Sequence, residues 1–140
     1  MNMALKNKFA QQYANNYVET AVSEASPHKL VTMLYEGAIK NLNLAKVFIE
    51  HKEFGKKSVH VNKALSIIDA LRNGVDLEVG GEVAENLYGL YDFCYRRSFE
   101  ASSKNDASMI TEVVEIISGL NESWNKMPEQ IKTSTKSQLQ

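Results

Sequence analysis

The sequence predicts an all-α protein, an antiparallel up-down four-helix bundle with a docked N-terminal arm. Apolar residues recur every three or four positions in four long segments between residues 26 and 127, as they do on one face of a helix. The sequence shows no strand-like alternation and no hairpin signal. The breaks between the segments are short, so we expect consecutive helices to be antiparallel.

The first predicted helix begins at Ser26-Pro27, because Ser can cap open backbone N–H groups and Pro is tolerated at the first helical position. It extends to about His51. Its apolar side is wider than a narrow seam and consists of Leu30, Val31, Leu34, Tyr35, Ala38, Leu42, Ala45, Phe48 and Ile49. The second predicted helix extends from about Glu53 to Leu77, and Gly80-Gly81 marks the break that follows it.

The third predicted helix, from about Glu82 to Ser103, carries two apolar stripes at a rotation of about 100° per residue. One is aliphatic, with Val83, Leu87, Leu90, Cys94 and Ala101. Beside it is an aromatic one, with Tyr88, Tyr91, Tyr95 and Phe99. A core-facing helix needs an arc of only about 100° or somewhat more, so the second stripe needs a partner of its own.

The fourth predicted helix begins after Asn105-Asp106, which supplies a turn and an N-cap, and ends at about Met127 before Pro128. Residues 128–140 form a polar tail that we expect to be disordered. Residues 1–25 form a predicted arm, in which four apolar or aromatic residues recur every four positions: Leu5, Phe9, Tyr13 and Tyr17. The arm is too weak a helix to be stable alone, so we expect it to order by docking on the bundle of residues 26–127.

Composition excludes several functional classes. The 140-residue chain has a net charge of -1, which provides no basic field for nucleic acid or an anionic membrane. The first 25 residues contain no continuous apolar run, so neither a signal peptide nor membrane insertion is predicted. A lone Cys94 fits a reducing compartment. We therefore expect a cytosolic protein.

Catalytic and ligand-binding signals are weak. None of His28, His51 and His60 has a second metal ligand at the spacing that helical sites favour. The Gly80-Gly81 pair precedes a predicted helix but follows another helix, and no phosphate-loop Lys or Ser/Thr accompanies it. The sequence predicts no enzymatic activity, no metal and no cofactor.

The two widened helices predict a protein-binding groove. If both expose a second apolar strip, an amphipathic helix or an extended segment from a partner can lie between them. The predicted groove residues are Tyr35, Ile39, Leu42, Tyr88, Tyr91, Tyr95 and Phe99. For any single one of Tyr88, Tyr91, Tyr95 and Phe99, filling the core is the default expectation, and the groove depends on the two widened helices taken together. The groove's occupant can equally be the N-terminal arm.

Several segments resemble the FliS-type flagellin export chaperones, in one order and at plausible spacing over about residues 10–127. The segments are Tyr17-Val18, residues 26–30, 33–38 and 63–68, Gly80-Gly81-Glu82, residues 87–97, Ala101, Asn105-Asp106 and Trp124. Phe93 and Cys94 stand where other members often have different aromatic or aliphatic residues.

The resemblance implies a small helical bundle of the bacterial cytosol without enzymatic activity. Such a protein binds the disordered C-terminal segment of flagellin, prevents its premature polymerisation and helps present it to the flagellar type III export gate. The resemblance also implies that the arm, with Phe9, Tyr13 and Tyr17, covers part of the groove when flagellin is absent. Tyr13 falls where the family carries a tyrosine associated with arm docking and contact with the export gate.

Two other interpretations are compatible with the residues alone. The bundle can be an interaction module for another amphipathic segment, such as that of an anti-sigma factor or a co-chaperone. It can also be a structural bundle whose aromatic strip forms a homodimer interface.

Overall fold

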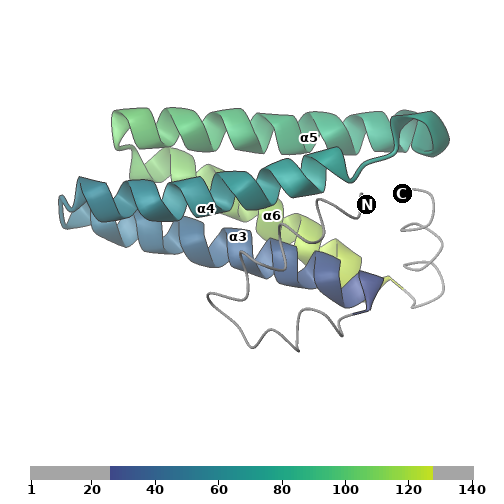
Figure 1. Ribbon diagram of the computed structural model, residues 1–140, viewed down its shortest axis with the longest axis horizontal. Coiled ribbons are helices and arrows are strands. Elements are labelled where there is room, and N and C mark those ends of the chain that lie inside the picture. The colour runs from purple at the N-terminus through teal and green to yellow at the C-terminus, as the bar shows by residue number, and fades with distance from the viewer. Residues whose placement is uncertain (1–25, 128–140) are drawn as a thin grey trace.

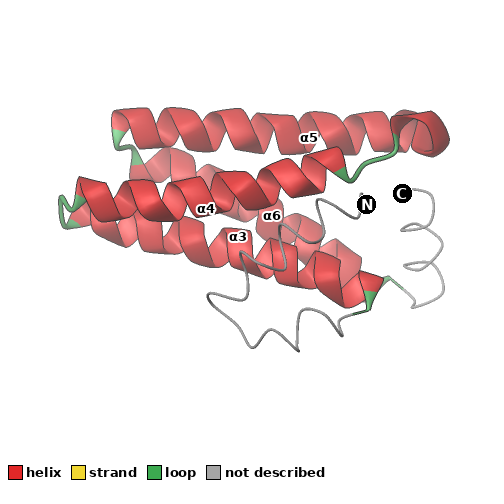
Figure 2. Cartoon of the chain, in the orientation of Figure 1, coloured by secondary structure: helices red, strands yellow, loops and turns green. Residues whose placement is uncertain are grey.

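The computed structural model describes residues 26–127, which form four helices joined by short loops (Figures 1 and 2). The helices are α3 (Pro27–Glu50), α4 (Phe54–Asn73), α5 (Leu77–Lys104) and α6 (Ala107–Lys126). The described residues contain no strand. The prediction of an all-α, antiparallel four-helix bundle is therefore confirmed. The predicted arm (1–25) and tail (128–140) lie outside the described residues.

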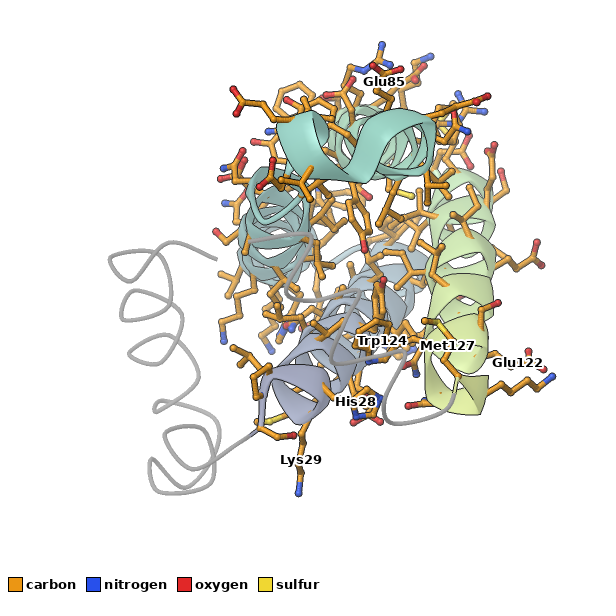
Figure 3. The ribbon with its side chains drawn as sticks, turned by 90° about the vertical axis from the view of Figure 1, so that its right-hand side faces the viewer. His28, Lys29, Glu85, Glu122, Trp124 and Met127 are labelled. Carbon is orange, nitrogen blue, oxygen red and sulfur yellow. The ribbon has the colours of Figure 1, made fainter. Side chains whose placement is uncertain are left out.

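Each helix packs against the next one in the chain, and α6 closes the ring against α3. Consequently α3 and α5 lie diagonally across the bundle, as the view along the helices in Figure 3 shows. The core lies between the four helices, and its largest fully buried aliphatic side chains include Leu34, Leu42, Ile68, Ile110 and Ile117. Burial of each such side chain contributes about 1.5–3 kcal/mol to the free energy of unfolding, compared with leaving it exposed.

Side-chain caps determine where three of the helices begin. Ser26 directly precedes Pro27, the first residue of α3. Its hydroxyl accepts a hydrogen bond from the Lys29 backbone N–H. Asp76 and Asp106 cap α5 and α6 in the same way, each through a carboxylate oxygen that accepts from two backbone N–H groups. These caps satisfy backbone donors that the helices cannot satisfy internally, so Asp76 and Asp106 fix where the α4–α5 and α5–α6 connections end and the next helix begins.

The predicted end of the second helix at Leu77 is wrong, whereas the predicted break at Gly80-Gly81 is present. The structure ends α4 at Asn73 and begins α5 at Leu77, with the Asp76 cap between them. The Gly80-Gly81 pair lies inside α5, where Gly81 adopts φ 59° and ψ -140° and kinks the helix. A short helical stretch that the sequence analysis did not predict therefore begins at Leu77, and the predicted break at the glycines separates it from the rest of α5.

The core seam of α5 also differs from the predicted division into stripes. The residues that face the core are spaced alternately by three and four: Ala84, Leu87, Tyr91, Cys94, Ser98 and Ala101. Tyr91, predicted on the aromatic stripe, is buried, whereas Val83, predicted on the aliphatic stripe, is 76% exposed. Aliphatic and aromatic residues therefore share the core-facing seam.

Candidate protein-binding surface

The structure separates the seven predicted groove residues into three groups by exposure. Tyr35, Leu42 and Tyr91 are buried in the core. Ile39, Tyr88 and Tyr95 are partly buried. Phe99 alone is strongly exposed, at 60%. The set as a whole therefore does not form one open groove in this structure.

Tyr35 and Tyr91 join the diagonal helices α3 and α5 through the core. Their hydroxyl oxygens lie 2.5 Å apart and share a hydrogen bond, and their ring centroids are 6.5 Å apart. They are only 4% and 3% exposed. Burial raises the pKa of the Tyr35 phenol, and burial together with the neighbouring phenol raises that of Tyr91 well above its usual value. Both hydroxyls therefore stay protonated at neutral pH.

Tyr95 lies at the contact between α5 and α4, where a charged cluster holds the two helices together. The Arg72 guanidinium of α4 is 4.6 Å from the Tyr95 ring centroid, a cation–π distance. Arg72 also forms ion pairs with Asp69 at 2.7 Å and with Asp92 of α5 at 2.8 Å. Arg72 occupies one face of the Tyr95 ring, so a partner protein can contact Tyr95 only through the rest of its side chain.

Among residues 26–127, α5 carries more exposed large apolar side chains than the other helices. Seven large apolar side chains are exposed among the described residues, and four of them are on this helix: Leu77, Val79, Val83 and Phe99. The other three, on α3 and α4, are Val47, Phe54 and Val59. Apolar side chains that gather on one helix in this way are typical of an interaction surface.

Sequence reasoning missed Val79 and gave Leu77 only as the end of the preceding helix. Val79 lies in the segment between the two predicted helices, which was assigned to an interhelical break because of Gly80-Gly81. The signal that would have found them is Asp76, an N-cap residue directly before Leu77. The predicted arm residues Phe9, Tyr13 and Tyr17 lie outside the described part of the chain.

Cys94, His28 and His60 are engaged in packing, whereas His51 is exposed. Burial raises the pKa of the Cys94 thiol to about 12, which keeps it protonated and a poor nucleophile. His28 stacks on Trp124 with ring centroids 5.0 Å apart, and Figure 3 shows the two side chains together between α3 and α6. His60 stacks on Phe48 and shares a 3.0 Å hydrogen bond with the Asn41 side-chain oxygen.

Within residues 26–127, no three His, Cys, Asp or Glu side chains are grouped as a metal site. A helix with the length and apolar character of a membrane span is also absent from this part of the chain. A helical bundle with packed nucleophiles and exposed apolar side chains on one helix is typical of proteins that act by binding other proteins.

The chain belongs to the family of the flagellar protein FliS, whose family model matches residues 9–131. It is 43% identical to the flagellar secretion chaperone FliS of Salmonella typhimurium over 116 residues, which are 82% of this chain and 86% of the relative. The FliS chaperone of Vibrio cholerae is 36% identical over 92% of this chain and 95% of its own length. That of Bacillus subtilis is 30% identical over 89% and 88% of the two chains. The resemblance found in the sequence is thus confirmed at the level of the family, which is one of secretion chaperones.

Proposed function

We propose that this protein is a cytosolic export chaperone that binds the disordered C-terminal segment of flagellin. By covering that segment it prevents premature polymerisation, and it aids delivery of flagellin to the flagellar type III export gate. Membership of the FliS family supports this function, since the relatives are named flagellar secretion chaperones. The structural observation that carries it is the accessible aromatic side of α5, where Phe99 is 60% exposed and Tyr88 and Tyr95 are only partly buried.

A disordered flagellin segment loses conformational entropy when it becomes ordered. Its complex with the chaperone must therefore bury a large apolar area to offset that free-energy cost. We infer that the client contacts the accessible part of the predicted groove, which is an aromatic strip consisting of Tyr88, Tyr95 and Phe99. These residues follow one side of α5 at spacings of seven and four, so they share one helix face. Each aromatic side chain can bury roughly 150–250 Å².

The buried members of the predicted groove have a different role in this proposal. Tyr35, Leu42 and Tyr91 stabilise the bundle that presents the strip, because their side chains are packed between the helices. Ile39 is packed against the core from its edge. The client therefore gains its contacts mainly from the outer face of α5.

The N-terminal arm is part of this proposal through the family resemblance. Phe9, Tyr13 and Tyr17 would cover the aromatic strip until flagellin displaces them, and Tyr13 would then contact the export gate. An arm and a client that share a surface compete, so the affinity for the client falls by the fraction of time that the surface is covered.

The substitution Phe99→Ser tests the strip. Calorimetric titration of the full chain with the C-terminal flagellin segment encoded in the same genome should show an affinity roughly tenfold lower than that of the unchanged protein, a loss of about 1.4 kcal/mol. The matched control is Val59→Ser, an exposed apolar residue of α4 that is 52% exposed. It should bind the segment normally.

Unchanged affinity in Phe99→Ser, or equal losses in both variants, would contradict the assignment of the strip. If flagellin does not bind the unchanged protein at all, the alternatives are an anti-sigma factor or a co-chaperone as partner, or a homodimer.

A further inference from the structure

The Arg72 guanidinium of α4 lies beside two residues of the aromatic strip of α5. Its Cζ is 4.6 Å from the centroid of the Tyr95 ring, and it also interacts electrostatically with Tyr88. Tyr88 and Tyr95 are seven residues apart, which is about two helical turns, so both lie on the side of α5 that faces this arginine. One side chain of α4 therefore interacts with two of the three strip residues.

Carboxylates from both helices hold the Arg72 guanidinium in place. Its Nη2 donates to Asp69 Oδ1 of α4 at 2.7 Å, and its Nη1 donates to Asp92 Oδ1 of α5 at 2.8 Å. The other Asp92 oxygen pairs with the Arg96 Nε at 2.9 Å. The Arg72 side chain is only 18% exposed. Because charge-assisted hydrogen bonds are short and directional, these two partners fix the plane of the guanidinium.

The charges of this network balance, since it contains two aspartates and two arginines. The network therefore provides no surplus charge with which Arg72 could attract a charged segment. What Arg72 contacts instead is one face of the Tyr95 ring, at a distance typical of a cation–π interaction. Any effect of Arg72 on a binding partner is accordingly transmitted through Tyr95.

A side chain that is held in place before binding loses less entropy in a complex. Immobilising a mobile side chain at an interface weakens affinity, and preorganisation removes that cost. Tyr95 is only partly buried, and Arg72 packs on one face of its ring. The rest of the ring is thus presented in a fixed orientation before a partner arrives.

We propose that Arg72 is a positioning residue of the flagellin site, which holds the Tyr95 ring in the orientation that binds the client. This inference rests on the proposed function and deepens it. It identifies a residue of α4, outside the aromatic strip, that determines how well the strip binds.

The substitution Arg72→Met tests the proposal, because it keeps an unbranched side chain but removes the guanidinium. Calorimetric titration of the full chain with the C-terminal flagellin segment should show an affinity about fivefold lower than that of the unchanged protein. If Arg72 acts through the Tyr95 ring, Arg72→Met should cause no further loss in a Tyr95→Ala background. In a Tyr95→Phe background, which keeps the ring, the loss should again be about fivefold.

The matched control is Arg97→Met. Arg97 also forms two ion pairs, with Glu100 of α5 and with Glu112 of α6, so it links α5 to the opposite neighbour. Urea unfolding should show that both arginine variants lose stability to a similar extent, because each loses two ion pairs. Only Arg72→Met should lose affinity for the flagellin segment, which distinguishes positioning of Tyr95 from a general effect on the bundle.

Three results would overturn the proposal: unchanged affinity in Arg72→Met, an equal loss in Arg97→Met, or the same loss in the Tyr95→Ala background. If Phe99→Ser weakens binding while Arg72→Met does not, only this inference fails. If the unchanged protein does not bind the segment, the proposed function fails, and the inference fails with it.

A milder variant covers the case in which Arg72→Met does not fold. In Arg72→Lys, a single ammonium group cannot pair with both carboxylates and stack on the ring at once, so affinity should still fall. NMR of the free protein with ¹³C-labelled tyrosine gives a second readout. The Tyr95 ring signals should move toward those of an unstructured tyrosine in Arg72→Lys but not in Arg97→Lys. Unmoved Tyr95 signals would contradict the positioning role.

Discussion

The Tyr35–Tyr91 pair places two hydroxyl groups inside a mainly apolar core. Each hydroxyl has the other as its hydrogen-bond partner, at 2.5 Å. A buried polar group that loses its partner costs about 1–3 kcal/mol, whereas removal of both partners can be nearly neutral. The pair therefore fixes the diagonal contact between α3 and α5 only as long as both hydroxyls are present.

Tyr35→Phe and Tyr91→Phe should each lower the free energy of unfolding by about 1–3 kcal/mol, because each leaves one buried hydroxyl unsatisfied. The double variant should be no less stable than either single variant. Urea unfolding at neutral pH measures all three. Costs that simply add in the double variant would show that the two hydroxyls do not act as a pair.

The same pair makes the stability of the unchanged protein depend on pH in the alkaline range. Burial raises the pKa of both phenols in the folded state. Above about pH 10, the unfolded chain releases these protons while the folded protein keeps them, so stability falls as pH rises further. Unfolding of the double phenylalanine variant should depend less on pH in this range.

At the scale of the element, α5 departs most from its sequence prediction. A rotation of 100° per residue places Leu87, Tyr91 and Cys94 within an arc of about 60°, and the 3.5-residue period of a bundle helix makes that arc the core seam. This seam includes Tyr91 and leaves Val83 outside the core. Which residues of a wide apolar face are buried depends on the neighbouring helices, and a single helix read alone does not contain that information.

Local signals predicted the helix starts where a cap and a break coincide. Ser26-Pro27 and Asp106 begin α3 and α6 as expected, since the caps act within one helical turn. Between α4 and α5 the signals conflict: Gly80-Gly81 is the stronger breaker in the sequence, but Asp76 supplies the cap that the helix uses. Both signals act in the structure, because α5 begins at the Asp76 cap and is then kinked at Gly81.

Gly81→Ala should destabilise the protein by about 1–3 kcal/mol, because alanine is strained at this conformation. Gly89 is the matched control, since it lies in the same helix and an added Cβ there meets no atom within 4 Å. Gly89→Ala should stabilise the protein by roughly 0.5–1 kcal/mol through helix propensity. Thermal unfolding compares them, and a stabilising Gly81→Ala would show that the kink is not required.

At the scale of the whole molecule, periodicity and short connections were sufficient to predict the four-helix architecture. The binding surface was predicted less well, since three of its seven residues, Tyr35, Leu42 and Tyr91, are buried. Fold class depends on the summed pattern of many residues, so single misplaced residues do not change it. A surface depends on the exposure of each residue, which is fixed only when the helices pack.

The central claim is that this bundle orders a disordered flagellin segment by burying it on apolar surface. Calorimetric titration of the full chain with the C-terminal flagellin segment, repeated over a range of temperatures and accompanied by circular dichroism, tests the claim most directly. The account predicts one-to-one binding, a negative change in heat capacity and a gain of helical signal, as coupled folding requires. Absence of binding at concentrations where both components are soluble, or binding without a heat-capacity change, would contradict it.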